Sequence, residues 1–206
     1  MKESLRYSLL YLARIAVYAA LMFALNAVFM YDAQHPTVTG KFGEVSGTEI
    51  LQELFLFLLG IIFIFVGRLD RSIAAIANLI SVFFFMAFIR EFNNQIDYWF
   101  YLVLPLMLLF AWLAFRDRKK LVDGFYNLLQ IPSVAYLFIG FLVTFIFSRL
   151  FGRTKFWEAL LEESYTRPAK NAGEEGIELL GYSLFFIAGI EILFYVLRKR
   201  KEEKRR

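Results

Sequence analysis

Six long runs of apolar residues constrain the fold of this chain more than any other feature of its sequence. Each run holds roughly 17 to 25 mainly apolar residues, the length that a helix needs to cross a bilayer, and is bounded by charges or turn residues. The runs cover residues 8–30, 49–67, 72–92, 98–115, 132–151 and 176–197. We therefore expect six transmembrane helices.

The composition agrees with a membrane location. Of the 206 residues, 59% are hydrophobic and 19% are aromatic, which is more apolar surface than a soluble domain of this size can bury. We predict an all-α integral membrane protein. Residues 1–197 form a single six-helix transmembrane domain, and residues 198–206 form a basic cytoplasmic tail. The sequence gives no boundary for a second domain.

The basic residues predict how the helices are oriented, because cytoplasmic loops carry an excess of Lys and Arg. With the N-terminus inside, the inner segments hold 15 basic residues and the outer segments hold 7. The inner set is Lys2, Arg6, Arg68, Arg71, Arg116, Arg118, Lys119, Lys120 and the seven basic residues of the tail. We expect both termini to be cytoplasmic. In general character the chain resembles small bacterial inner-membrane proteins, which implies an inner-membrane location.

Two connecting stretches have apolar residues at helical spacing, a pattern typical of helices that lie in the membrane interface. The apolar face of residues 117–131 is formed by Leu121, Val122, Phe125, Leu128 and Leu129. That of residues 155–166 is formed by Phe156, Trp157, Leu160, Leu161 and Tyr165. We predict a short amphipathic helix in each stretch, one on either side of the membrane.

The sequence lacks the residues on which much enzyme chemistry depends. It has no Cys, a single His at position 35 in a glycine-containing loop, and no Gly-x-Ser-x-Gly motif. Disulfides, cysteine nucleophiles and sites with several Cys or His ligands are excluded, and a serine hydrolase is not supported. We expect no cofactor, no metal and no catalytic residue, and we favour a protein that is not an enzyme.

The net charge of +4 does not indicate a nucleic-acid partner, because most of the excess lies in residues 198–206. This tail follows a hydrophobic run and is better interpreted as an anchor beside anionic lipid. The lipid bilayer is thus the first partner that we expect. A small solute or cation, a membrane protein partner and a second copy of the chain are the others.

Charged residues within a membrane span cost something like 2.5–3.5 kcal/mol each, so each needs a structural or functional reason. Four of them are expected at similar depth in the outer half of the bundle: Glu53, Arg90, Glu91 and Glu178. Four further polar residues are close enough in sequence or depth to support them: Gln52, Asp97, Arg149 and Glu174. The set contains more acids than bases, which suits a cation, a proton relay or an amine. The alternative is a salt-bridge network that fixes helix packing.

A second charged pair is predicted in the inner half. Arg14 lies about 9 Å from the start of the first helix and Glu191 about 10 Å from the end of the sixth, at 1.5 Å per residue. At this shared depth they can form a buried pair that joins the first and last helices. Alternatively, Arg14 extends to lipid phosphate while Glu191 contacts Arg198 or Lys199.

Three other glutamates fit the pattern of helix capping. Glu49 lies three residues after Ser46, which predicts a capping box at the start of the second helix. Glu174 and Glu175 follow Asn171 in the same way, which predicts a cap at the start of the sixth.

Three functions remain open from the sequence. The first is binding or permeation of a small solute or cation through the outer polar cluster. The second is a structural or assembly subunit of a larger membrane complex, which fits the small size and the two amphipathic helices. The third is a lipid-modifying enzyme that uses carboxylates in the outer leaflet.

Overall fold

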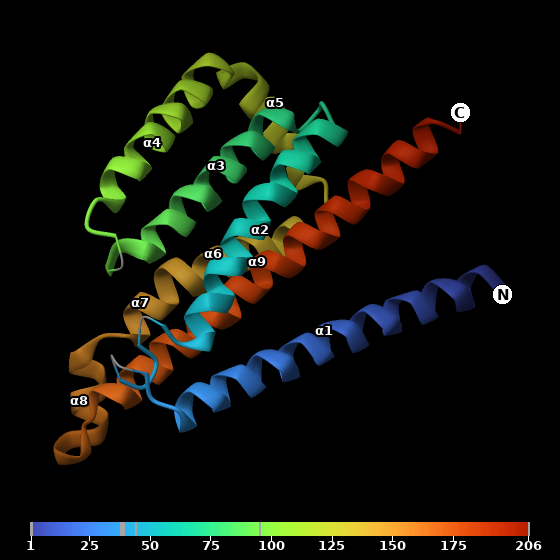
Figure 1. Ribbon diagram of the computed structural model, residues 1–206. Helices are drawn as coiled ribbons and strands as arrows, with labels where there is room; N and C mark the ends of the chain where they lie inside the picture. The colour runs from blue at the N-terminus through green and yellow to red at the C-terminus, as the bar shows by residue number, and fades with distance from the viewer. Residues whose placement is uncertain (1, 38–39, 44, 95, 206) are drawn as a thin grey trace.

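A computed structural model describes residues 2–37, 40–43, 45–94 and 96–205 of the chain (Figure 1). The structure is 86% helical. Its described residues contain no strand, apart from an isolated β-bridge between Thr37 and Gly40. Six helices in this part of the chain are long and apolar enough to span a membrane, which confirms the predicted all-α membrane bundle.

Five of the spans are single helices: α1 (Lys2–Gln34), α2 (Gly47–Leu69), α3 (Ala74–Glu91), α4 (Trp99–Arg116) and α9 (Arg167–Glu203). The other span joins α6 (Val134–Phe141), a π-helical segment (Leu142–Phe147) and α7 (Ser148–Phe151). The connecting helices are α5 (Arg118–Leu129) and α8 (Thr154–Leu161), in the two stretches where amphipathic helices were predicted. Short 3-10 turns at Phe92–Asn94 and Glu162–Ser164 complete the chain.

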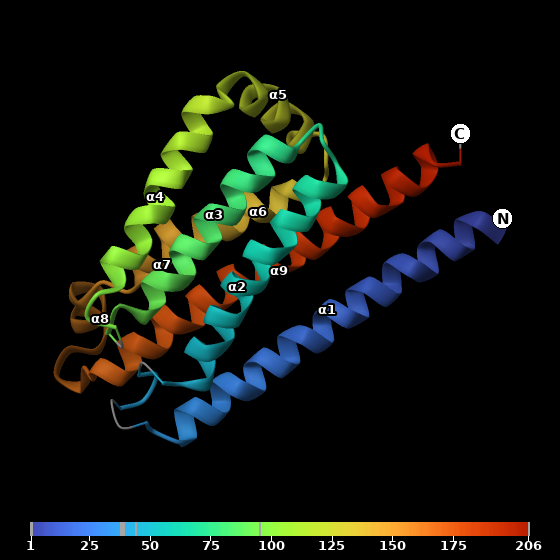
Figure 2. The same ribbon diagram turned by 45° about the horizontal axis from the view of Figure 1, so that its top comes forward.

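The helices α2, α3 and α9 form the centre of the bundle, with α4 along one side and α1 along the other (Figures 1 and 2). The core is built from large apolar side chains on these three helices, including Leu56, Phe63, Phe84, Phe185 and Ile192. The most apolar stretches of α2 and α9 are 44% and 56% buried, whereas those of α1 and α4 are 6% buried. The outer two helices therefore present most of their surface to lipid or to a partner.

Small residues allow the central helices to approach closely, as expected for packing within a membrane. The hydroxyl of Ser81 on α3 donates a hydrogen bond to the carbonyl oxygen of Gly60 on α2, at 2.8 Å. On the other side of α9, Gly181 lies against the π-helical segment, where an added Cβ would overlap the hydroxyl of Thr144. The first contact fixes α3 against α2, and the second fixes the rotation of α9 and thereby the direction of its polar side chains.

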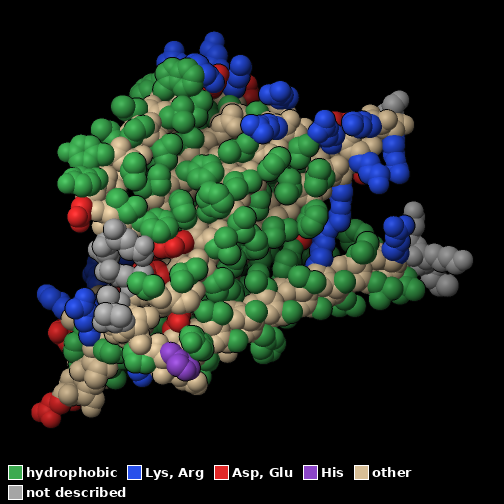
Figure 3. Space-filling view, in the orientation of Figure 1, with side chains coloured by type: hydrophobic (Ala, Val, Ile, Leu, Met, Phe, Trp, Pro, Cys, Tyr) green, Lys and Arg blue, Asp and Glu red, His purple; other side chains and the backbone are tan. Residues whose placement is uncertain are grey.

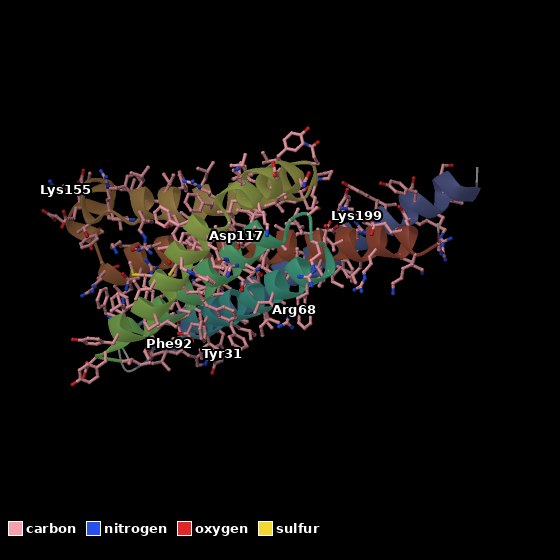
Figure 4. All side chains as sticks on the ribbon, turned by 90° about the horizontal axis from the view of Figure 1, so that it is seen from above. Tyr31, Arg68, Phe92, Asp117, Lys155 and Lys199 are labelled. Carbon is pink, nitrogen blue, oxygen red and sulfur yellow. The ribbon has the colours of Figure 1, made fainter. Side chains whose placement is uncertain are left out.

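The two ends of the bundle differ in charge. We name one end of the bundle the α5 end. It carries the start of α1, the last residues of α9, the α2–α3 connection and α5. Lys and Arg side chains gather there on the face that Figure 3 shows. In Figure 4, Arg68 and Lys199 point to this end and Lys155 to the opposite one, the α8 end. Residues 198–203 of the predicted tail continue α9.

The sixth span starts nine residues earlier than residue 176, because α9 begins at Arg167 with Pro168 in its first turn. Proline fits this position, since the first helical N–H groups have no internal partner. The predicted caps at Glu174 and Glu175 are therefore wrong, as both residues lie inside the helix.

The predicted cap at the start of α2 is present, with Ser46 Oγ accepting from the Glu49 N–H at 3.3 Å. Asp32 at the end of α1 adds a cap that the sequence analysis missed. Its carboxylate accepts from the N–H groups of Gly47 at 2.9 Å and Thr48 at 2.7 Å. This carboxylate ties α1 to α2 across the connecting loop.

Candidate functional site

Polar side chains from α2, α3, α7 and α9 meet near the α8 end of the bundle. We name this group the charged cluster and define it by its eight residues: Gln52, Glu53, Arg90, Glu91, Arg149, Glu174, Glu175 and Glu178. Seven of these contact one another or other polar side chains through direct hydrogen bonds or ion pairs. The eighth, Glu53, is described separately below.

The first part of the cluster joins α3 to α9 through Glu91. The guanidinium of Arg90 lies 2.9 Å from Glu91 Oε1, and the hydroxyl of Tyr182 donates to the same oxygen at 2.9 Å. Tyr182 is fully buried. One carboxylate oxygen thus holds a cation from its own helix and a hydroxyl from a neighbouring helix.

The second part joins α7 to α9 through Arg149, whose two terminal nitrogens contact two carboxylates. One nitrogen lies 3.0 Å from Glu174 and the other 2.9 Å from Glu178. Glu178 is 5% exposed and also accepts a hydrogen bond from Ser148 at 3.2 Å. Glu174 contacts a second cation, Lys170, at 2.6 Å. The forked guanidinium is well suited to such a double contact.

The third part joins α2 to α9. The buried side-chain amide of Gln52 donates to the carboxylate of Glu175 at 3.1 Å, and its nitrogen also lies 3.4 Å from the carbonyl oxygen of that residue. Sequence analysis assigned Glu175 to a cap and so missed it as a cluster member. The available signal was its spacing, because residues three apart on a helix share a face and Glu178 is three residues further on.

Glu53 is half-buried in the second turn of α2. Its side chain forms neither a hydrogen bond nor an ion pair with any other residue that the structure describes, and the charged group that acts on it is the carboxylate of Glu91. Two like charges repel, and they do so more strongly where the surroundings are less polar than water. Glu53 and Glu175 thus both lack a cation among the described residues, and of the two only Glu175 has a hydrogen-bond donor, Gln52.

The cluster as a whole is short of positive charge. Its acids are Glu53, Glu91, Glu174, Glu175 and Glu178, and the cations that touch them are Arg90, Arg149 and Lys170. Asp97, predicted to support the cluster, lies exposed in the turn between α3 and α4, and the described residues place no ion-pair partner beside it.

Neither of two open cavities on the surface of the bundle is lined by the cluster. One, of about 250 Å³, lies between α1 and α9, and the other, of about 510 Å³, lies between α3 and α5. Glu53, Arg90, Glu91 and Glu178 line neither of them. In the described part of the chain, no three His, Cys, Asp or Glu side chains are grouped so as to hold a metal ion.

A separate charged group joins α1 to α9 nearer the α5 end. Arg14 lies 2.9 Å from Glu191, and Tyr18 donates a hydrogen bond to the other oxygen of the same carboxylate. The side chain of Glu191 is 13% exposed. Tyr18 was missed by sequence analysis, although it lies four residues after Arg14 and so on the same helix face.

No protein-family model matches this chain, and no curated protein or solved structure matches it either. The geometry of the charged residues is therefore the basis on which a function is proposed for this polytopic membrane protein.

Proposed function

We propose that this protein binds a small cation, a proton or an amine, at the charged cluster, and that Glu53 and Glu91 are its ligands. The observation that carries this proposal is the carboxylate of Glu53, which lies beside Glu91 and has no cationic partner among the described residues. A buried or half-buried carboxylate without a partner is costly in a membrane. A bound cation would remove both that cost and the repulsion from Glu91.

The contacts of the neighbouring residues support the same assignment. Arg90 is already paired with Glu91, and Arg149 is paired with Glu174 and Glu178, so neither is placed to neutralise Glu53 as well. Tyr182 holds the shared Glu91 carboxylate in place. The cluster thus pairs Glu91, Glu174 and Glu178 with cations and leaves Glu53 and Glu175 without one among the described residues.

Binding is better supported than passage through the protein. The charged cluster and the Arg14–Glu191 pair lie on different turns of α9, and Glu178 and Glu191 are about 20 Å apart along the helix. The two cavities described above do not link them. We place the cluster on the outer side of an inner membrane, with both termini cytoplasmic, because the basic residues gather at the α5 end.

The proposal is tested by cation binding to the purified protein in detergent, with methylammonium as probe and sodium as competitor at constant ionic strength. We expect methylammonium to raise the unfolding temperature of the wild type. Glu53→Gln and the Glu53→Gln/Glu178→Gln double variant should lose this response while retaining their helical circular dichroism spectrum. The same measurement across pH tests the proton as ligand.

Glu163→Gln is the matched control, because Glu163 lies exposed near α8 at the same end of the bundle. It should respond to cations as the wild type does. If the folded Glu53→Gln variant also responds like the wild type, to methylammonium and to pH, the cation proposal is wrong.

A second function is favoured by one observation, the low burial of α1 and α4. We propose as the alternative that these helices bind a membrane protein partner or a second copy of the chain in an assembly. The chain has no Cys, so a single introduced cysteine reports on this directly. If α1 packs against a second copy, Ala20→Cys on its exposed face should form a disulfide between the two copies in native membranes, whereas a lipid-facing α1 would stay monomeric.

A further inference from the structure

The cavity of about 510 Å³ lies at the α5 end, between the start of α3 and the helix α5. It is therefore at the opposite end of α3 from Arg90 and Glu91, and it is independent of the charged cluster. Its charged and amide side chains include Arg71, Asn78, Arg116, Asp117, Lys120 and Asp123. Figure 4 labels Asp117, where α4 ends and α5 begins.

The start of α3 forms one wall of this cleft and lacks a cap. Its N-cap residue, Ile73, has no side-chain cap, the first turn holds no acidic residue, and Ala74 and Ala75 of this turn line the cleft. The carboxylate nearest in sequence, that of Asp70, is engaged by Ser72 and Lys199. The N–H of Ala74 already donates to the carbonyl oxygen of Arg71 at 3.4 Å, so it is the N–H groups that follow it in this turn that favour a negatively charged ligand.

Two charged side chains of the lining have no internal partner. Arg71 on one wall and Asp123 on the other are exposed to solvent, and they form no ion pair or side-chain hydrogen bond with another described residue. By contrast, Asp117 is held by Arg116 at 2.6 Å and by Lys120 at 3.7 Å. The hydrogen bond from Arg116 lowers the pKa of Asp117, so this carboxylate is ionised at neutral pH.

We propose that the cleft binds a phosphoethanolamine group. The phosphate lies against Arg71 and the first turn of α3, and the ammonium lies against Asp123. A phosphate alone would leave Asp123 without a partner, and an amine alone would leave Arg71 without one. A group that carries both charges satisfies both walls of the cleft.

The position of the cleft suits a lipid headgroup. Arg116 lies over the ring of Trp112 at 3.9 Å, and Trp112 is exposed on the last turns of α4. Tryptophan and amphipathic helices such as α5 are typical of the membrane interface, where headgroups lie. A soluble compound with the same group shares this chemistry, so the experiment separates the two sources.

The test uses the full chain in dodecyl maltoside and measures binding by calorimetry. The probes are short-chain phosphatidylethanolamine, short-chain phosphatidylglycerol and soluble glycerophosphoethanolamine. We expect the wild type to bind phosphatidylethanolamine about tenfold more tightly than phosphatidylglycerol, because only the former offers a charged group to Asp123. If glycerophosphoethanolamine binds as tightly, the natural source is soluble; if it binds much more weakly, the source is a lipid.

Two variants and two controls locate the binding. Arg71→Ala should weaken binding of both lipids by about tenfold, whereas Arg68→Ala, in the last turn of α2 and outside the cleft, should not. Asp123→Asn should remove the preference for phosphatidylethanolamine, whereas Glu202→Gln, exposed near the end of α9, should keep it. Equal binding by Arg71→Ala and Arg68→Ala, or an unchanged preference in Asp123→Asn, would overturn the proposal.

Discussion

The charged cluster and the Arg14–Glu191 pair both place ionised groups inside membrane-spanning helices, but they differ in charge balance. Arg14 supplies one cation to Glu191, and Tyr18 completes the hydrogen bonding of that carboxylate. In the cluster Arg90 and Arg149, with the adjacent Lys170, face five acids, and neither Glu53 nor Glu175 has a cation among the described residues. A balanced pair is explained by packing alone, whereas the unbalanced group is where we propose that a cation binds.

The largest effect is expected from removing the cation of the balanced pair. Arg14→Ala leaves the carboxylate of Glu191 without its partner, which should lower the free energy of unfolding by about 3 kcal/mol. The measurement is denaturant unfolding in mixed micelles. The double variant Arg14→Leu/Glu191→Leu should recover most of the loss, since it buries no charge.

Arg6→Ala is the matched control for this prediction, because Arg6 is exposed on the same helix. It should unfold like the wild type. If Arg14→Ala also stays within about 0.5 kcal/mol of the wild type, the pair does not hold α1 to the bundle, and the side chain of Arg14 is better explained by contact with lipid phosphate.

Removing single hydroxyls should have a smaller effect and should separate the two regions. Tyr18→Phe and Tyr182→Phe each lose one hydrogen bond to a carboxylate, so each should lower the free energy of unfolding by about 1 kcal/mol. Tyr182→Phe should in addition weaken methylammonium binding, because Tyr182 holds Glu91 in place. Equal methylammonium affinity in the two variants would contradict the role assigned to Glu91. The control is Tyr195→Phe, because Tyr195 is exposed on α9.

The smallest effect concerns another ion pair in which one cation balances one acid. This pair lies at the α5 end. Asp70 at the end of α2 lies 2.6 Å from Lys199. Burial alone would raise the pKa of Asp70, but hydrogen bonds from Lys199 and Ser72 lower it below its ordinary value of 3.8. Because the pKa is lowered in the folded state, the stability from this pair is fully present above that value and is lost as the pH falls further.

Acid titration of unfolding measures this contribution. Below about pH 4, Asp70→Asn should lose less stability than the wild type, by under about 1 kcal/mol because the pair is partly exposed to solvent. Asp123→Asn is a control at the same end of the bundle, since Asp123 has no ion pair among the described residues. Identical acid profiles for Asp70→Asn and the wild type would show that the pair contributes nothing.

The helices themselves were predictable because hydropathy and length report on membrane spans directly. The start of α9 was not, since residues 167–175 are polar and extend the helix beyond the apolar run. Pro168 indicates this earlier start, because proline is common in the first turn of a helix. The pattern of apolar residues does not contain this signal.

The depth of each charged residue along its helix was predictable from the sequence, but the residues that it contacts were not. The positions of Glu53, Arg90, Glu91 and Glu178 along their helices follow from residue counting, whereas which partner each contacts depends on helix rotation. That rotation is fixed by close contacts such as Gly60 with Ser81 and Gly181 with Thr144. Tyr182 was missed for this reason, whereas Glu175 was missed because it was assigned to a helix cap. Asp97 was included although it lies in an exposed turn.

The central claim is that the carboxylate of Glu53 has no cation until a ligand binds, whereas the carboxylate of Glu191 is already paired with Arg14. The most direct measurement is the free energy of unfolding of Glu53→Gln and Glu191→Gln, each with and without methylammonium. We predict that Glu53→Gln is at least as stable as the wild type and gains nothing from the cation, whereas Glu191→Gln is less stable and still gains. A Glu53→Gln variant that loses stability as Glu191→Gln does, and still responds to the cation, would contradict the account.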